Sequence, residues 1–162
     1  MSEETSQPAN DGAGQPENDE TSRPARNEDL VARLRDARRR EKGMTLFYRA
    51  LAAAAEDAGR VADAERLNEL HADEQHHLSR LTARLLELGE APAGLRDMER
   101  PEVDLPTWEE AARQREAGEV EYYRAWIDGG IDDAATGDVV AEILESEVHH
   151  HRDLGGKWMP AT

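Results

Sequence analysis

The chain contains an internal repeat, and the repeated letters are those that a metal site needs. The segment REKGMTLFYRA, which begins at Arg40, is matched by REAGEVEYYRA, which begins at Arg115. The tetrapeptide EQHH, which begins at Glu74, is matched by EVHH, which begins at Glu147. Each half therefore carries a lone glutamate that is followed, about thirty residues later, by an E-x-x-H motif. A chain that duplicates both elements is most simply building one symmetric site from its two halves.

Composition excludes several classes of protein and of site. The 162 residues are enough for one domain with a hydrophobic core. Cysteine is absent, which excludes disulfides, thiolate metal sites and a cysteine nucleophile. The 36 acidic and 20 basic residues give a formal net charge of −16, which opposes binding to nucleic acid or to an anionic membrane. Because we find neither a transmembrane-length apolar run nor a signal-peptide pattern, we expect a cytoplasmic protein.

The pattern of residues changes near residue 27. Residues 1–26 are polar and acidic with several prolines and glycines, so we expect a disordered tail there. From residue 27 onward, apolar residues recur three and four positions apart, which predicts amphipathic helices. The expected helices cover 27–57, 61–88, 107–128 and 138–154, with a crossover at 89–106 and a C-terminal tail at 157–162. Two hairpins joined by a long crossover predict an all-α four-helix bundle over residues 27–156.

Local signals predict where these helices begin and end. Asn27 is the expected N-cap of the first helix, and Gly59 is its expected stop. Thr107 opens a T-x-x-E pattern, which predicts a capping box at the third helix. The last two helices are expected to end at paired glycines, at 129–130 and 155–156.

Six titratable side chains occupy positions where the helical spacing calls for apolar residues. They are Glu41, Glu74, His77, Glu116, Glu147 and His150. Ionised carboxylates in a dry core are costly unless they are paired or metal-bound. The charge of four glutamates is neutralised by two divalent cations. Because carboxylate and imidazole ligands without sulfur suit iron or manganese, with zinc able to occupy the same site by affinity, we expect two metal ions of this kind.

Each of these residues also has an alternative interpretation. Glu41 could pair in solvent with an arginine of the run 38–40, and residues 149–151 could be an exposed histidine run. A single E-x-x-H motif often arises by chance in an acidic helix. All six histidines, however, lie at 71–77 or 149–151, in the two E-x-x-H segments. This concentration favours the interpretation as a site for two metal ions.

At these motifs the chain resembles the ferritin-like superfamily, which includes bacterioferritin, rubrerythrin and related di-iron carboxylate proteins. The resemblance covers about residues 28–155, and it implies a ferritin-like four-helix bundle. It implies these roles: terminal carboxylates Glu41 and Glu116, bridging carboxylates Glu74 and Glu147, and single-metal ligands His77 and His150.

The resemblance also implies roles for three residues next to the metals. Tyr48 and Tyr123 would each hydrogen-bond a carboxylate of the opposite half, and filling of the core is the alternative role. Glu119, one turn after Glu116, would be an additional ligand, since rubrerythrin has two glutamates on its third helix. The repeat favours Glu116 as the principal ligand, because Met44 corresponds to Glu119.

The leading functional prediction is a rubrerythrin-type oxidoreductase that reduces hydrogen peroxide or dioxygen. Without cysteine for a rubredoxin-like centre, it would need an external electron donor. The alternative is a ferroxidase or iron-storage protein that uses the same site. A second alternative is a di-iron substrate hydroxylase, which the tripeptide at 117–119 supports only weakly. We expect a homo-oligomer, with Trp108, Trp126 and Trp158 either at a subunit contact or in the core.

Overall fold

The computed structural model describes residues 22–157, with side chains from residue 26 to residue 155. Its elements are α1 (Ser22–Asp57), α2 (Val61–Glu87), η1 (Leu105–Thr107), α3 (Trp108–Asp128), α4 (Ala134–Arg152) and η2 (Asp153–Lys157). Residues 22–157 contain no strand, which confirms the all-α prediction. The tails expected at 1–26 and 157–162 lie mostly outside these residues, as does Trp158.

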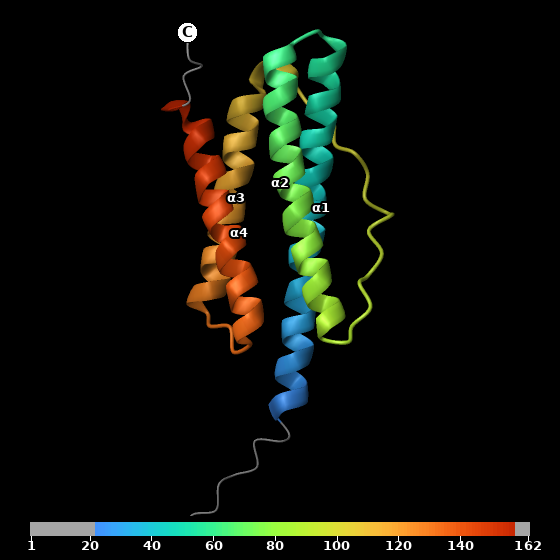
Figure 1. Ribbon diagram of the computed structural model, residues 1–162, viewed down its shortest axis with the longest axis vertical. Helices are drawn as coiled ribbons and strands as arrows, with labels where there is room; N and C mark the ends of the chain where they lie inside the picture. Colours follow the sequence, from blue (N-terminus) through green and yellow to red (C-terminus); the bar gives the residue numbers. More distant parts are fainter. Residues whose placement is uncertain (1–21, 158–162) are drawn as a thin grey trace, which may run out of the picture.

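The four helices form two hairpins joined by a long crossover (Figure 1). α1 packs against α2, and α3 packs against α4. The chain turns after α1 at Gly59 and after α3 at Gly130, where φ is 69° and 87°. Glycine adopts such positive φ values without steric cost. Because the crossover travels the length of the bundle, α3 runs antiparallel to α1 (Figure 1).

Arginines of α1 hold the crossover against the first hairpin. Arg38 Nη1 donates a hydrogen bond to Ala93 O at 2.9 Å, and its Nε donates to Thr82 Oγ1 of α2 at 2.8 Å. Arg39 Nη2 lies 3.3 Å from Asp97 Oδ2. These arginines therefore bind the crossover, and neither of them neutralises a carboxylate in the interior of the bundle.

Two apolar clusters fill the bundle, and a polar layer lies between them. One cluster includes Leu34 of α1 and Trp126 of α3, and the other includes Leu51 of α1 and Trp108 of α3. Glu41 lies on α1 between the residues of the two clusters, and it is fully buried. Both described tryptophans are therefore core residues, which decides between the two roles predicted for them.

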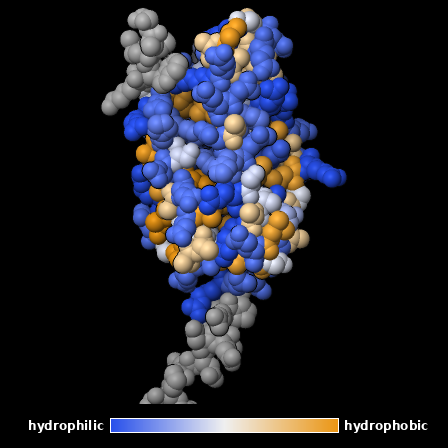
Figure 2. Space-filling view, in the orientation of Figure 1, coloured by the Kyte–Doolittle hydropathy of each residue, from blue (hydrophilic) through white to orange (hydrophobic). Residues whose placement is uncertain are grey.

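The surface of the bundle is mainly hydrophilic on the face that Figure 2 shows. Among the residues whose side chains are described, the large apolar ones that are exposed are Val61, Leu86 and Val148. The first two lie at opposite ends of α2, and the third lies in α4. None of the described helices is both long enough and apolar enough to cross a membrane.

Two helices begin earlier than the sequence predicted. α1 begins at Ser22, before the expected N-cap Asn27. α4 begins at Ala134, and not near residue 138, because Asp133 is its N-cap. The carboxylate of Asp133 accepts a hydrogen bond from Thr136 N at 3.0 Å, which satisfies one of the free N–H groups of the first turn.

Two predicted helix ends are wrong. Thr107 is the N-cap residue of α3, but it makes no capping bond, and its hydroxyl donates to Asp104 instead. The chain enters α3 through η1, so Thr107 has φ −111° and ψ 15° and not the extended backbone typical of a capping box. At the other end, α4 ends at Arg152. The chain then forms the π-helical turn η2 (Asp153–Lys157), which includes both glycines that were expected to end the helix.

We expect Asp133→Ala to lower the free energy of unfolding by about 1–2 kcal/mol, because the variant loses the N-cap of α4. It also loses the ion pair in which Arg84 Nη2 lies 2.8 Å from Asp133 Oδ2. Urea denaturation of the metal-free protein, followed by circular dichroism, measures the change. The control is Asp132→Ala at the exposed neighbouring position. Equal losses in the two variants would contradict the assignment of the cap.

Candidate metal centre

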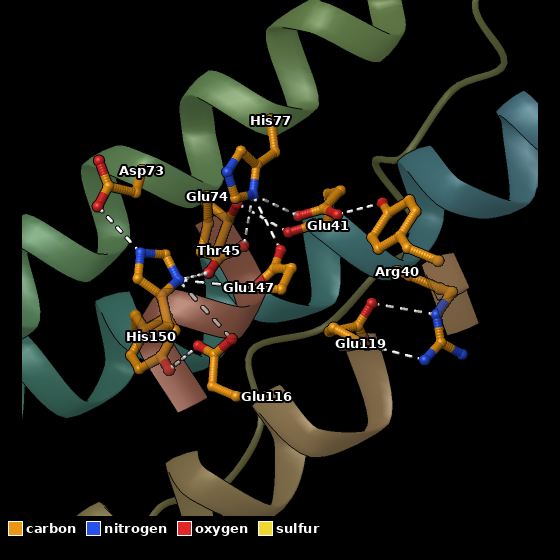
Figure 3. Close-up of polar contacts among 12 residues, drawn as sticks. Arg40, Glu41, Thr45, Asp73, Glu74, His77, Glu116, Glu119, Glu147 and His150 are labelled. Atoms are coloured by element: carbon orange, nitrogen blue, oxygen red, sulfur yellow. Dashed lines mark hydrogen bonds and ion pairs between the residues drawn. The ribbon is translucent and has the colours of Figure 1, made fainter. Parts of the chain in front are cut away.

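Four helices deliver six titratable side chains to the polar layer of the bundle (Figure 3). α1 and α3 supply one glutamate each, and α2 and α4 supply a glutamate and a histidine each. The six are Glu41, Glu74, His77, Glu116, Glu147 and His150. The glutamates are fully buried, and the histidines are no more than 5% exposed. The structure thus brings together all six residues that the repeat singled out.

The cluster consists of two sets of four residues that share two members. Glu41 and His77 complete one set, and Glu116 and His150 complete the other. Within each set, one ligand atom per residue lies within 4.8 Å of every other. The shared members are Glu74 and Glu147. This is a geometry for two cations held side by side.

Each shared carboxylate turns one oxygen toward each histidine. Glu74 Oε2 lies 3.4 Å from His77 Nδ1, and its Oε1 lies 3.5 Å from His150 Nδ1. Glu147 Oε1 lies 3.0 Å from His77 Nδ1, and its Oε2 lies 3.5 Å from His150 Nδ1. Two ligands about 2.1 Å from one ion and at right angles to each other are about 3.0 Å apart. The observed separations are close to this value.

Each terminal carboxylate lies next to one histidine. Glu41 Oε2 lies 3.5 Å from His77 Nδ1, and Glu116 Oε2 lies 3.7 Å from His150 Nδ1. Their other oxygens accept hydrogen bonds from tyrosines of the opposite half. Tyr123 OH donates to Glu41 Oε1, and Tyr48 OH donates to Glu116 Oε1. Each tyrosine therefore leaves one oxygen of its carboxylate facing the cluster.

The inward atoms of the cluster have no hydrogen-bond partner. Among the described side chains, nine buried nitrogen or oxygen atoms lack a partner, and all but Arg35 Nε belong to these six residues. They include the Nδ1 atoms of both histidines and both oxygens of each shared carboxylate. An unsatisfied buried polar atom costs about 1–3 kcal/mol, and more when it is charged. Cations between the two histidines would satisfy all eight atoms of the cluster at once.

The pKa values of the cluster residues also indicate that buried negative charge needs positive charge beside it. Burial raises the pKa of Glu41 well above its usual value, and it raises the pKa of Glu116 to about 7. Burial lowers the pKa of His77, but the carboxylates around it outweigh this and raise the pKa to about 12. Burial also raises the pKa of Tyr123, with the charge of Glu41 adding to the effect, so this hydroxyl stays a donor.

Glu119 lies outside both sets of four. Its two oxygens accept hydrogen bonds from Arg40, at 3.2 Å from Nε and 2.8 Å from Nη2 (Figure 3). Arg40 also lies over the ring of Tyr122, 4.2 Å from its centroid. Burial raises the pKa of Glu119 to about 7, although Arg40 lowers it. In this arrangement Glu119 is the partner of an arginine.

One residue at the cluster, Asp73, was not predicted from the sequence. Its Oδ2 lies 3.0 Å from His150 Nε2, on the side of the ring that faces away from the cluster (Figure 3). A carboxylate in this position orients a metal-binding histidine and fixes its tautomer. The available signal was local, because Asp73 directly precedes an E-x-x-H motif. His76 and His149, the histidines next to the two E-x-x-H ligands, are exposed and lie outside the cluster.

Comparison with known proteins supports the architecture. No protein-family model and no curated protein matches the chain. A solved structure of Desulfovibrio desulfuricans bacterioferritin, described for its diiron site in different catalytic states, is similar, with a TM-score of 0.72. The match has 21% sequence identity and covers 82% of this chain and 79% of that one. This chain has the ferritin-like fold. The four-helix bundle predicted from the helical pattern, and the ferritin-like fold that the resemblance implied, are therefore confirmed.

Stability of the metal-free protein is expected to fall as the pH rises from 4.5 to 7. The folded-state pKa of Glu116 is raised from 4.5 to about 7. Its contribution to stability is therefore complete below pH 4.5 and is lost as the pH rises through about 7. The raised pKa of His77 acts in the same direction at higher pH.

Glu116→Gln removes the titration of this carboxyl while it keeps an acceptor for Tyr48. Relative to the variant, the wild type should lose up to about 3 kcal/mol between pH 4.5 and 7. Urea denaturation at a series of pH values, in the presence of a chelator, measures the difference. Glu145→Gln, at an exposed position of α4, is the control and should follow the wild type. Parallel profiles for wild type and Glu116→Gln would contradict the prediction.

Proposed function

We propose that the chain binds two iron ions in the polar layer and acts as a ferroxidase. In this proposal, Glu41 and Glu116 would each be a terminal ligand of one ion, and Glu74 and Glu147 would serve as ligands of both ions. His77 and His150 each bind one ion through Nδ1. The observation that carries the proposal is the set of eight buried, unpartnered nitrogen and oxygen atoms that face one another at the level between the two apolar clusters.

Iron fits the chemistry of these ligands. Carboxylate oxygens and imidazole nitrogens without sulfur suit iron and manganese, and zinc competes by affinity. Two divalent ions neutralise the four buried glutamates. Bound iron would supply the electrons: two ferrous ions would give up one electron each, and these two electrons with two protons would reduce dioxygen to hydrogen peroxide. Ferrous iron is thus both the occupant of the site and its substrate.

The protein supplies a fixed anionic cage for this chemistry. Tyr48 and Tyr123 hold the terminal carboxylates, so that the inward oxygens are in place before a cation arrives. The buried carboxyl groups of Glu41 and Glu116, whose pKa values are raised, hold protons that entering cations displace. The two apolar clusters on either side limit the access of water to the layer.

A rubrerythrin-type peroxide reductase, the leading prediction from the sequence, is the second candidate. It is favoured by Glu119, a carboxylate only 6% exposed and one turn from Glu116. The bidentate bond to Arg40, however, occupies both oxygens of Glu119 and leaves six ligands in the cluster. This arrangement favours the ferroxidase, and an external electron donor is then not required. No observation favours the hydroxylase, since the exposed large apolar side chains among those described are far apart.

Iron storage is an extension of the ferroxidase proposal that depends on assembly. Storage needs a hollow multimer or an enclosing compartment, and we propose a homo-oligomer of unknown size. The net charge of −16 would help to attract ferrous ions both to a small oligomer and to a storage shell. Light scattering of the iron-loaded protein, with iron counted per chain, separates a small oligomer with two ions from a shell with many.

Loss of a bridging carboxylate should abolish binding of the metal pair. We expect the wild type to bind two ferrous ions per chain under anaerobic conditions, and Glu74→Ala and Glu147→Ala to bind at most one. Each bridge contributes to both sets of four, so its removal affects both ions. Equilibrium dialysis with metal analysis gives the stoichiometry, and Glu145→Ala is the exposed control on α4. Two ions per chain in both bridge variants would overturn the assignment.

Glu119→Gln should distinguish the two candidate reactions. If the centre is a ferroxidase with six ligands, the variant should oxidise ferrous iron with an initial rate within about twofold of the wild type, because Glu119 lies outside both sets of four residues. Stopped-flow absorbance under oxygen measures this rate. A loss of one metal ion, or a loss of peroxide reduction with iron oxidation retained, would favour the rubrerythrin-type reaction. Glu116→Gln is the matched change at a proposed ligand.

A further inference from the structure

One hydrogen bond beside the cluster is present in one half and absent from the other. Both histidines turn Nδ1 inward, toward the carboxylates. On the opposite side of its ring, His150 Nε2 lies 3.0 Å from Asp73 Oδ2. No described side chain makes a hydrogen bond or ion pair with His77 Nε2. Two histidines that are equivalent in the repeat therefore have different surroundings.

The sequence explains this difference. Asp73 directly precedes one E-x-x-H motif, and Ser146 directly precedes the other. The antiparallel register that sets residue 73 of α2 beside residue 150 of α4 also sets residue 146 beside residue 77. The hydroxyl of Ser146 has no charge and a shorter reach than a carboxylate. The symmetric structure thus has an aspartate at one of two equivalent positions.

A second difference between the halves is neutralised. Glu119 has Met44 as its counterpart, so one half carries an additional buried carboxylate. Arg40 binds both oxygens of Glu119 and cancels its charge. Asp73 has no arginine partner, since His150 is the one described side chain with which its carboxylate forms an ion pair or hydrogen bond. The charge of Asp73 is therefore a difference between the two metal positions that no described arginine compensates.

We propose that Asp73 makes the two metal positions unequal, so that the position formed by Glu116 and His150 binds its ion first. The inference rests on the proposed two-metal site and adds an order of filling. An acceptor carboxylate on Nε2 keeps the proton there and leaves Nδ1 free for the metal. It also orients the ring and raises its basicity, and removal of such a partner typically costs 10–100-fold in metal affinity. The position formed by Glu41 and His77 is the weaker one and exchanges its ion faster.

Stepwise titration with cobalt(II) tests this order. Cobalt(II) replaces iron without oxidation, its visible absorption reports each step, and the Nε2–H proton of each ligating histidine gives a paramagnetically shifted NMR signal. We expect the wild type to bind two ions in steps separated by about 10–100-fold. The first signal to appear should be that of His150, identified as the one that is missing in His150→Ala.

Substitutions at the two equivalent positions, 73 and 146, should change the two binding steps in opposite directions. Asp73→Asn should weaken the first step by about 10–100-fold and bring the two steps together, while Ser146→Asp should strengthen the second step. Glu69→Gln is the matched control, because it removes one exposed charge from α2 one turn before Asp73. Urea denaturation of each metal-free variant shows whether the fold is retained, so that a structural effect is separated from a change in metal affinity.

The possible outcomes separate this inference from the proposed function. Two equal steps in the wild type, or steps that Asp73→Asn leaves unchanged, would overturn the order of filling and leave the two-metal site intact. First filling of the position formed by His77 would also overturn it. If the wild type binds no pair of ions at all, the proposed function itself fails.

Discussion

The burial of four carboxylates at one level of the bundle is the constraint on which the rest of the structure depends. Apolar side chains fill the bundle on both sides of this level, so the carboxylates have no direct access to bulk water. Ionised groups in such a place are tolerated only with matching positive charge. The arginine run at 38–40 does not supply it, since Arg38 and Arg39 bind the crossover and Arg40 binds Glu119. Two divalent cations meet the requirement.

Approximate twofold symmetry places the repeated residues around one centre. Because α1 and α3 are antiparallel, a tyrosine that follows each terminal glutamate by two helical turns reaches the glutamate of the other half. The bonds from Tyr48 to Glu116 and from Tyr123 to Glu41 are the result. Arg40 over Tyr122 and Arg115 over Phe47 form a second pair of equivalent contacts. The long crossover makes this arrangement possible, because it returns the chain to the end of the bundle from which α3 must start.

The two halves of the site differ chemically at two positions that are equivalent in the repeat. Glu119 corresponds to Met44, and Asp73 corresponds to Ser146. In the first case, an additional buried carboxylate is held by Arg40 and kept apart from the cluster. In the second, one histidine gains an acceptor that the other lacks. The repeat thus supplies the cage, and the second difference is the one by which we propose that the two metal positions become unequal.

The sequence by itself determined the four helices, their amphipathic faces and the six polar positions on those faces, because helical spacing and an internal repeat are local patterns. It did not determine the ends at Thr107, Asp133 and Arg152, where turn geometry decides. It also left open whether Glu119 joins the cluster, and it did not reveal the partner of His150. Those contacts link α1 to α3 and α2 to α4, so only the packing of the two hairpins decides them. Side-chain direction in a bundle depends on neighbours from other helices, which no single helix pattern contains.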